Sequence, residues 1–323
     1  MLTTSEVLNT PDLSPGGDPL AAVRRAPWHL SREQVQHFDG NGYLILRNRV
    51  SGELLRRAQA AGDRWIERGL ELEQSTPAGH HGGDFVFAQR AGGKVLFRVN
   101  YLHDKGEPAS LELLGSPEIL GIAESFCGPN FVPTYESMVF KMPGDGEAIP
   151  WHQDAVFPRK FRVFNVDIYL DESTAQGGAL RVVPGSHRQV HDVCNFAAQH
   201  GWNHPKMITV EMQPGDVLVH DDMILHGSPA TIGNRLRRTI YFEFRSAEQI
   251  IAEGPFDADF VEKRFRLIPL ALRRHRAAFP DASQFEWQAD AARRTNGTAS
   301  EAEELRIIHK VHTPGSYCSA SAR

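Results

Sequence analysis

The sequence predicts a mainly β fold, a jelly roll or β-sandwich with helices packed on one side. From about residue 133 the chain consists of short strand-forming runs, separated by turn signals such as Pro143-Gly144-Asp145-Gly146 and Pro214-Gly215. Before this region, and again after Ser246, apolar residues recur at helical spacing. Short strands at this rhythm are typical of a jelly roll, and helices outside them fit a barrel that is buttressed on one face.

The first part of the chain is predicted to be an arm that leads into the folded domain. Residues 1–27 are rich in Pro, Gly and Ser, so we expect a flexible arm there and a single domain over 28–323. Ser31 and Gln34 form a capping box, which predicts a short helix after Ser31. A strand is expected to follow over 43–47.

Two further helices are predicted before the strands begin. Residues 52–69 place apolar side chains at helical spacing, which indicates a helix with one buried face. Ser116 is a candidate cap for the next helix, with Pro117 in its first turn and Gly128 at its end. Apolar and aromatic residues in such stripes are usually core, and we interpret them as core here.

The strand-rich core is predicted over about 132–245, and a helical extension over 250–323. Within the extension, residues 256–279 are expected to form one helix whose arginines face solvent. The strands are predicted at 134–142, 163–170, 179–183, 207–212, 216–220, 223–227 and 237–244.

Composition excludes several classes of function. The chain has 323 residues, 41% of them hydrophobic, and a formal net charge of -5, which argues against general nucleic-acid binding. No apolar run is long enough to span a bilayer, and no signal peptide is evident. The three cysteines, Cys127, Cys194 and Cys318, lack a CxxC pair and do not indicate a disulfide framework. Sparse, reduced cysteines fit a reducing compartment, and we expect a cytoplasmic monomer or homodimer.

The most informative string is Pro150-Trp151-His152-Gln153-Asp154. Side chains at i and i+2 of an extended chain lie on the same face, roughly 6.6 Å apart along it, so His152 and Asp154 can reach a common ion. The best third ligand is His226, which is followed by the small residues Gly227 and Ser228. Two histidines and one carboxylate on one side of an ion suit non-haem Fe(II) oxygen chemistry, because the other positions stay open.

A second H-x-D occurs at His220-Asp221-Asp222 and is a possible alternative pair. If this stretch is extended, His220 and His226 lie about 20 Å apart and cannot share an ion without a sharp bend. Asp222 and His226 would lie about 13 Å apart on the same assumption. His220 is therefore interpreted as a neighbour of the site or as a structural residue.

A cation for a carboxylate ligand is expected on the strand over 237–244. This strand alternates, with Arg237 on its polar face and apolar residues such as Ile240 on the other, as the wall of a barrel that holds a polar ligand requires. The planar fork of an arginine pairs with a carboxylate, and 2-oxoglutarate carries a carboxylate far from the end that chelates iron. Arg237 is preferred, since Arg235 lies nearer the turn and Arg238 points the other way.

Taken together, these motifs resemble the phytanoyl-CoA 2-hydroxylase family. The resemblance covers roughly residues 30–245, and it rests on the strings that include Phe38 to Leu46, His152-Gln153-Asp154, Gly177-Gly178-Ala179-Leu180, Pro184-Gly185-Ser186-His187, Pro214-Gly215-Asp216, His226-Gly227-Ser228 and Arg237.

The resemblance implies a double-stranded β-helix, a jelly-roll or cupin-like fold buttressed by N-terminal and C-terminal helices. It also implies that His152, Asp154 and His226 bind Fe(II), and that Arg237 and Ser228 hold 2-oxoglutarate. Further residues expected to contact the co-substrate are Met138, Gln153, Arg98 and Lys141.

The function that follows is that of a dioxygenase dependent on Fe(II), 2-oxoglutarate and O2. It would hydroxylate an unactivated C–H bond of a small molecule, in the manner of a natural-product tailoring enzyme, and release succinate and CO2. The presence of Asp154 favours hydroxylation, desaturation or ring formation over halogenation. Desaturation or cyclisation on the same scaffold, and a non-catalytic jelly-roll binding protein with a structural metal, are the alternatives.

Overall fold

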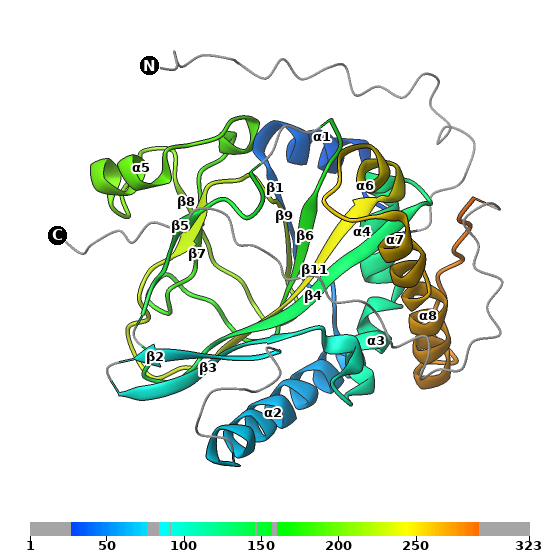
Figure 1. Ribbon diagram of the computed structural model, residues 1–323, viewed down its shortest axis with the longest axis horizontal. Helices are drawn as coiled ribbons and strands as arrows, with labels where there is room; N and C mark the ends of the chain where they lie inside the picture. The colour runs from blue at the N-terminus through cyan, green and yellow to red at the C-terminus, as the bar shows by residue number, and fades with distance from the viewer. Residues whose placement is uncertain (1–26, 76–83, 91, 146, 157–159, 291–323) are drawn as a thin grey trace.

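The computed structural model describes residues 27–75, 84–90, 92–145, 147–156 and 160–290, and it has two antiparallel sheets at its centre (Figure 1). The larger sheet has the order β1 (Tyr43–Leu46), β9 (Val217–Asp221), β6 (Phe164–Tyr169), β11 (Arg237–Ser246), β4 (Phe131–Lys141), β3 (Gly93–Asn100) and β2 (Phe85–Arg90). The smaller sheet has the order β5 (Ile149–His152), β10 (His226–Ser228), β7 (Leu180–Val182) and β8 (Ile208–Val210). The prediction of a double-stranded β-helix with helical buttresses is confirmed.

The pairing of β11 with β4 forms the middle of the larger sheet and separates an apolar face from a polar one. Ile240, Phe242 and Phe244 of β11 are buried in the main apolar core, on the face that helices cover. The intervening residues face the space between the two sheets, and there Arg237 lies opposite Lys141 of β4. The inner face of β11 and β4 is therefore polar, whereas the main hydrophobic core lies on the outer face of the larger sheet.

Helices from both ends of the chain cover the outer face of the larger sheet (Figure 1). Each of them buries one apolar stripe against the sheet or against a neighbouring helix. Their bounds are α1 (Arg32–Asn41), α2 (Gly52–Ser75), α3 (Pro108–Leu114), α4 (Pro117–Cys127), α6 (Ala247–Glu253), α7 (Ala258–Phe265) and α8 (Leu267–Ala278). The remaining helical segments are η1 (Leu102–Asp104), η2 (Ser186–Arg188) and α5 (Val193–His200), and α5 lies beside the smaller sheet.

Several predicted elements are found where the sequence placed them. The capping box of Ser31 and Gln34 begins α1, and Pro117 lies in the first turn of α4. The hairpin of β2 and β3 and the helix α5 were not predicted. The predicted helix over 256–279 is wrong in one respect, because it divides at Arg266 into α7 and α8.

Two other expectations are corrected or lie outside the described residues. Cys194 is disulfide-bonded, so the expectation that the cysteines are reduced is wrong for this residue, while Cys127 is free. The predicted arm over 1–27, apart from residue 27, and the chain beyond residue 290 are not described. None of the described helices combines the length and apolar character needed to cross a bilayer.

Arg264 of α7 is fully buried, which corrects the prediction that the arginines of this region face solvent. Its guanidinium forms an ion pair with Glu136 and donates to the carbonyl of Pro133, both on β4. Glu136 also contacts His103 of η1. Burial alone would raise the pKa of Glu136, but Arg264 and His103 outweigh burial and hold the pKa of this carboxyl well below its usual value.

We predict that Arg264→Met lowers the free energy of unfolding by about 3–5 kcal/mol, because it leaves Glu136 buried without its cation. Urea unfolding at pH 7 measures the change. Arg56→Met is the control, because Arg56 pairs with Glu53 on the exposed surface of α2 and such a pair contributes at most about 1 kcal/mol. Equal destabilisation by the two variants would contradict a special role for the buried pair.

Candidate metal centre

The two predicted histidine ligands meet where β5 and β10 pair. His152 ends β5, His226 begins β10, and the two residues are direct cross-strand partners whose ring centroids lie 4.1 Å apart. Gly227 permits this close pairing, since a Cβ there would lie 3.1 Å from the carbonyl oxygen of Ile149 and 3.0 Å from the Trp202 ring. The pairing register therefore places both imidazoles on the inner face of the smaller sheet.

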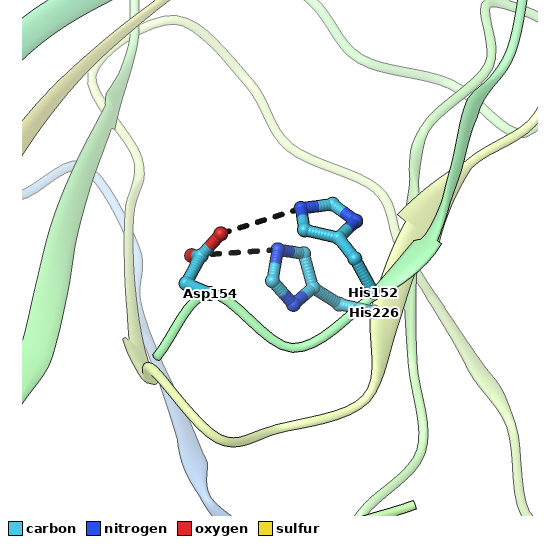
Figure 2. A group of neighbouring side chains, drawn as sticks. All are labelled: His152, Asp154 and His226. Carbon is cyan, nitrogen blue, oxygen red and sulfur yellow. Dashed lines mark ion pairs between the residues drawn. The ribbon is translucent and has the colours of Figure 1, made fainter. Parts of the chain in front are cut away.

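Asp154 completes the group from the loop that follows β5 (Figure 2). Its Oδ1 lies 3.3 Å from Nε2 of His152, and its Oδ2 lies 3.7 Å from Nε2 of His226. The potential ligand atoms of these three residues all lie within 4.8 Å of one another, and the described residues contain no other such group. The predicted triad is thus brought together from two distant parts of the chain.

Hydrogen bonds to the backbone fix which nitrogen of each ring is available. Nδ1 of His152 lies 2.7 Å from the carbonyl oxygen of Pro150, and Nδ1 of His226 lies 2.9 Å from that of Ile224. A carbonyl can only accept, so each Nδ1 carries the proton and each Nε2 presents a lone pair. Both rings are therefore oriented as metal-bound imidazoles commonly are.

The charge states also suit a cation. Burial, together with the neighbouring His152, lowers the pKa of His226 to about 3, so the ring is neutral at physiological pH. Burial opposes ionisation of Asp154, but His226, His152 and His220 together hold the pKa of this carboxyl well below its usual value. Two imidazoles and one carboxylate form the donor set that non-haem Fe(II) oxygenases use.

The second H-x-D lies next to this group, contrary to the expectation for an extended chain. A tight turn over 221–225 provides the sharp bend, so the ring of His220 lies 4.9 Å from the ring of His226. The backbone nitrogen of Asp154 donates to the carbonyl of Asp222 at 2.8 Å. These residues therefore surround Asp154, although His220 does not belong to the ligand group.

A second cluster of polar groups surrounds Arg237, which lies on the inner wall as predicted. Its Nη1 donates to the carbonyl of Gly178, and its Nη2 donates to Oγ of Ser228 at 3.3 Å. Ser228 follows His226 by two residues in β10, so both side chains lie on one face, roughly 6.6 Å apart along the strand. The guanidinium is thereby held beside Ser228, two residues along β10 from His226.

Lys141 adds a second buried cation beside Arg237. Its side chain is almost fully buried, and its Nζ donates to the carbonyl of Pro229 at 2.5 Å. Burial and the charge of Arg237 lower the pKa of Lys141 to about 7. In the described part of the chain, neither Lys141 nor Arg237 forms an ion pair, and both donate to backbone carbonyls. The nearby carboxylate of Asp145 is paired with Arg90 instead. A Cβ at Gly178 (φ +67°) would lie 2.9 Å from Nζ of Lys141, so glycine keeps this corner open.

The other predicted contacts are placed differently. Met138 pairs with Ile240 and lies in the apolar core beside Gly62 of α2, on the opposite face of the sheet from Arg237, so the structure does not bring it to the site. Gln153 lies between His152 and Asp154, so its side chain points away from theirs. It is buried, and its amide nitrogen donates to the carbonyls of Gln189 and Met223.

Arg98 of β3 lies opposite Val139 of β4 and faces the barrel interior, where its charge acts on the buried Tyr135 and Tyr241. Arg235 is exposed and pairs with Glu172. Arg238 points to the outer face, as predicted, and there it pairs with Asp63 and Asp171.

The sequence analysis did not assign roles to Asn165 and Asp167 of β6. Asn165 donates to Oδ2 of Asp154 at 3.4 Å and to Oδ1 of Asp222 at 3.0 Å. Asp167 is fully buried and contacts Nδ1 of His220 at 2.9 Å. The alternation of polar and apolar residues along 163–170 was the available signal, because it puts both side chains on the inner face.

The class of protein follows from this fold and site together: an antiparallel β-helix that carries a two-histidine, one-carboxylate group on its inner wall is a scaffold of non-haem iron oxygenases. The sequence profile of the phytanoyl-CoA dioxygenase (PhyH) family matches residues 38–239, which is more than half of the chain. The chain belongs to this family, and its class is that of the Fe(II)- and 2-oxoglutarate-dependent dioxygenases. The prediction of the family from the sequence is confirmed.

Two relatives named as dioxygenases and one solved structure are similar to this chain. The chain is 26% identical over 243 residues to the peroxisomal phytanoyl-CoA dioxygenase of Mus musculus, which covers 68% of this chain and 69% of the relative. It is 27% identical over 258 residues to the 2-aminoethylphosphonate dioxygenase of Uncultured bacterium HF130_AEPn_1, covering 76% of this chain and 92% of the relative. The crystal structure of AviO1 from Streptomyces viridochromogenes Tue57 is similar with a TM-score of 0.56 and 27% identity, over 67% of this chain and 95% of that one.

We predict that Asp154→Ala lowers the affinity for Fe(II) by more than about 100-fold, because only the two imidazoles would remain as donors. Anaerobic competition with a coloured iron chelator measures the affinity. Asp281→Ala, at an exposed acidic residue far along the chain, is the control. Wild-type affinity in Asp154→Ala would exclude this aspartate as a ligand.

Proposed function

We propose that the protein hydroxylates an unactivated C–H bond of a small molecule, with His152, Asp154 and His226 as iron ligands. Arg237, Ser228 and Lys141 hold the far carboxylate of 2-oxoglutarate in this proposal. The observation that carries it is a pair of buried cations beside Ser228, neither of which forms an ion pair with a carboxylate of the described residues. Two like charges in a buried site are costly unless an anion joins them, and the co-substrate supplies one.

The spacing of β10 matches the two ends of the co-substrate. His226 and Ser228 lie on the same face of this strand, so a molecule that chelates a metal at His226 runs towards Ser228 and Arg237. The hydroxyl of Ser228 and the fork of Arg237 can both donate to a carboxylate there. Lys141 adds a third donor from the opposite strand.

Each part of the site has a separate task. When bound, Fe(II) supplies the redox chemistry that couples O2 reduction to decarboxylation of 2-oxoglutarate, with succinate and CO2 as products. The two backbone-anchored imidazoles and Asp154 hold the coordination positions on one side and leave the other side open. The polar wall of β11 and β4 orients the co-substrate, and the surrounding core keeps bulk water away.

The presence of the carboxylate ligand favours hydroxylation, desaturation or ring formation over halogenation. Of these three outcomes, hydroxylation is proposed because it is the simplest. Dioxygenases among the relatives act on small molecules, which supports a small-molecule substrate here. A role in natural-product biosynthesis is part of the proposal. Mass spectrometry of the product with 18O2 distinguishes an added hydroxyl from loss of two hydrogens.

We predict that Arg237→Ala raises the dissociation constant of 2-oxoglutarate by about 10- to 100-fold, since a charge-assisted bidentate contact contributes roughly 1.5–3 kcal/mol. The measurement is anaerobic titration of the Fe(II)-loaded protein, followed by the visible charge-transfer band of the chelate. Arg235→Ala is the matched control, because this exposed arginine pairs with Glu172 and lies off the site.

The two outcomes of that titration separate the candidate functions. A band that appears in the wild type and needs more co-substrate in Arg237→Ala supports the oxygenase. Absence of any band from wild-type protein that demonstrably holds iron would exclude 2-oxoglutarate as co-substrate. The binding-protein alternative with a structural metal would then replace the proposal.

Lys141 makes co-substrate binding dependent on pH in this proposal. Its pKa of about 7 means that it is mostly neutral above pH 7 and charged below it in the free protein. A bound carboxylate favours the charged form, so binding above pH 7 must take up a proton. We predict that the dissociation constant of 2-oxoglutarate rises up to about tenfold per pH unit above pH 7 and levels off below it.

The same anaerobic titration between pH 6 and 9 measures this dependence. Lys141→Met should remove it, because methionine keeps the buried volume and cannot take up a proton. Lys94→Met is the control, since Lys94 pairs with Glu73 on the surface. An unchanged pH dependence in Lys141→Met would assign the proton to another group.

A further inference from the structure

The H-x-D at His220-Asp221-Asp222 lies against Asp154, and the proposed function assigns no role to His220. We propose that His220, braced by Asp167, is a positioning residue that holds one carboxylate oxygen of Asp154 and leaves the other oxygen to the metal. The inference rests on the proposed function only in taking Asp154 as an iron ligand.

The contacts of His220 place it between two carboxylates. The side chain is 1% exposed and lies on β9, directly opposite Asn165 of β6. Its Nδ1 is 2.9 Å from Oδ2 of Asp167, and its Nε2 is 3.4 Å from Oδ2 of Asp154. Asp167 is itself fully buried on β6, so the ring is fixed from behind and its other edge points at Asp154.

The two oxygens of Asp154 have different surroundings as a result. Oδ2 lies within 3.4 Å of both Nε2 of His220 and the amide nitrogen of Asn165. Oδ1 has neither contact and lies 3.3 Å from Nε2 of His152, whereas Oδ2 lies farther, at 3.7 Å, from Nε2 of His226, the second proposed imidazole ligand. Asn165 is held in turn by Asp222, whose backbone carbonyl accepts from the nitrogen of Asp154. The whole H-x-D therefore serves to orient one carboxylate.

Orientation of this carboxylate decides how many positions the metal keeps open. His152, His226 and one oxygen of Asp154 would hold Fe(II) and would leave a position for O2 beside the co-substrate. If Oδ2 turned to the metal as well, it would fill that position. Hydrogen bonds from His220 and Asn165 to Oδ2 oppose this turn, because they would be lost without replacement in a buried site.

His220 could instead be a metal ligand itself, and the geometry argues against this. The ligand atoms of His152, Asp154 and His226 lie within 4.8 Å of one another, and His220 does not extend this group. Its Nε2 is aimed at an oxygen of Asp154, and its Nδ1 is taken by Asp167. Variants at position 220 can distinguish a metal ligand from a positioning residue.

Asparagine and glutamine at position 220 form a matched pair for this purpose. The amide of glutamine reaches the place of Nε2 and can still donate to Asp154, whereas that of asparagine reaches only the place of Nδ1, next to Asp167. Both are polar and uncharged, so they impose similar demands on folding. His204→Gln is the control, since His204 lies beside Phe196 and His200, away from the ligand group.

We expect His220→Gln to bind Fe(II) within about threefold of the wild type and His220→Asn to bind it about 10- to 100-fold more weakly. Chelator competition under anaerobic conditions measures the affinity, and urea unfolding of the metal-free proteins verifies that both variants fold. The charge-transfer band with 2-oxoglutarate should shift in His220→Asn and stay in place in His220→Gln.

Two results would overturn the proposal. Wild-type affinity and an unmoved band in both variants would show that His220 does not position Asp154. Loss of iron in both variants, as severe as in Asp154→Ala, would make His220 a ligand. Absence of the band from all proteins, the wild type included, would reject the proposed co-substrate, but the ratio of iron affinities between the two variants would still decide the role of His220.

Discussion

The pairing of β5 with β10 is the constraint on which the site depends. This short antiparallel contact puts His152 opposite His226, and the backbone carbonyls of Pro150 and Ile224 then turn both Nε2 atoms inward. A shift of one residue would point either histidine to the outer face, because side chains alternate along a strand. Gly227 keeps the pairing close, since any Cβ would press on the backbone of β5 and on Trp202. The same strand carries Ser228, which lies beyond an irregularity in that pairing and accepts from Arg237.

The division between the two faces of the larger sheet explains how so polar an interior is tolerated. The apolar core lies between that sheet and the helices, where residues such as Phe242 and Phe244 are buried. That core provides most of the stabilisation, at roughly 25 cal/mol per Å² of apolar surface removed from water. The inner face can then carry groups that weaken the empty protein, above all the adjacent Lys141 and Arg237. A site that is destabilised until an anion arrives is a usual compromise between stability and function.

Asp154 shows how a single ligand depends on several distant segments. Its backbone is tied to Asp222, and its side chain meets residues of β6 and β9 in addition to the two histidines. The chain belongs to the phytanoyl-CoA dioxygenase family, and the contacts of this chain show how the carboxylate is supported.

The sequence by itself determined the strand-rich centre, the capping box of α1, the alternation of β11 and the identity of the three candidate ligands. Each of these depends on local periodicity or on residues a few positions apart, and such signals survive without tertiary contacts. It misplaced Met138 and Gln153, and it did not foresee the tight turn that brings the rings of His220 and His226 together, because strand register and one turn decide these positions. It also could not reveal that Arg264 is buried against Glu136, or that Lys141 lies beside Arg237. Those facts come from pairing between segments far apart in the chain, and the tertiary structure alone settles which segments pair.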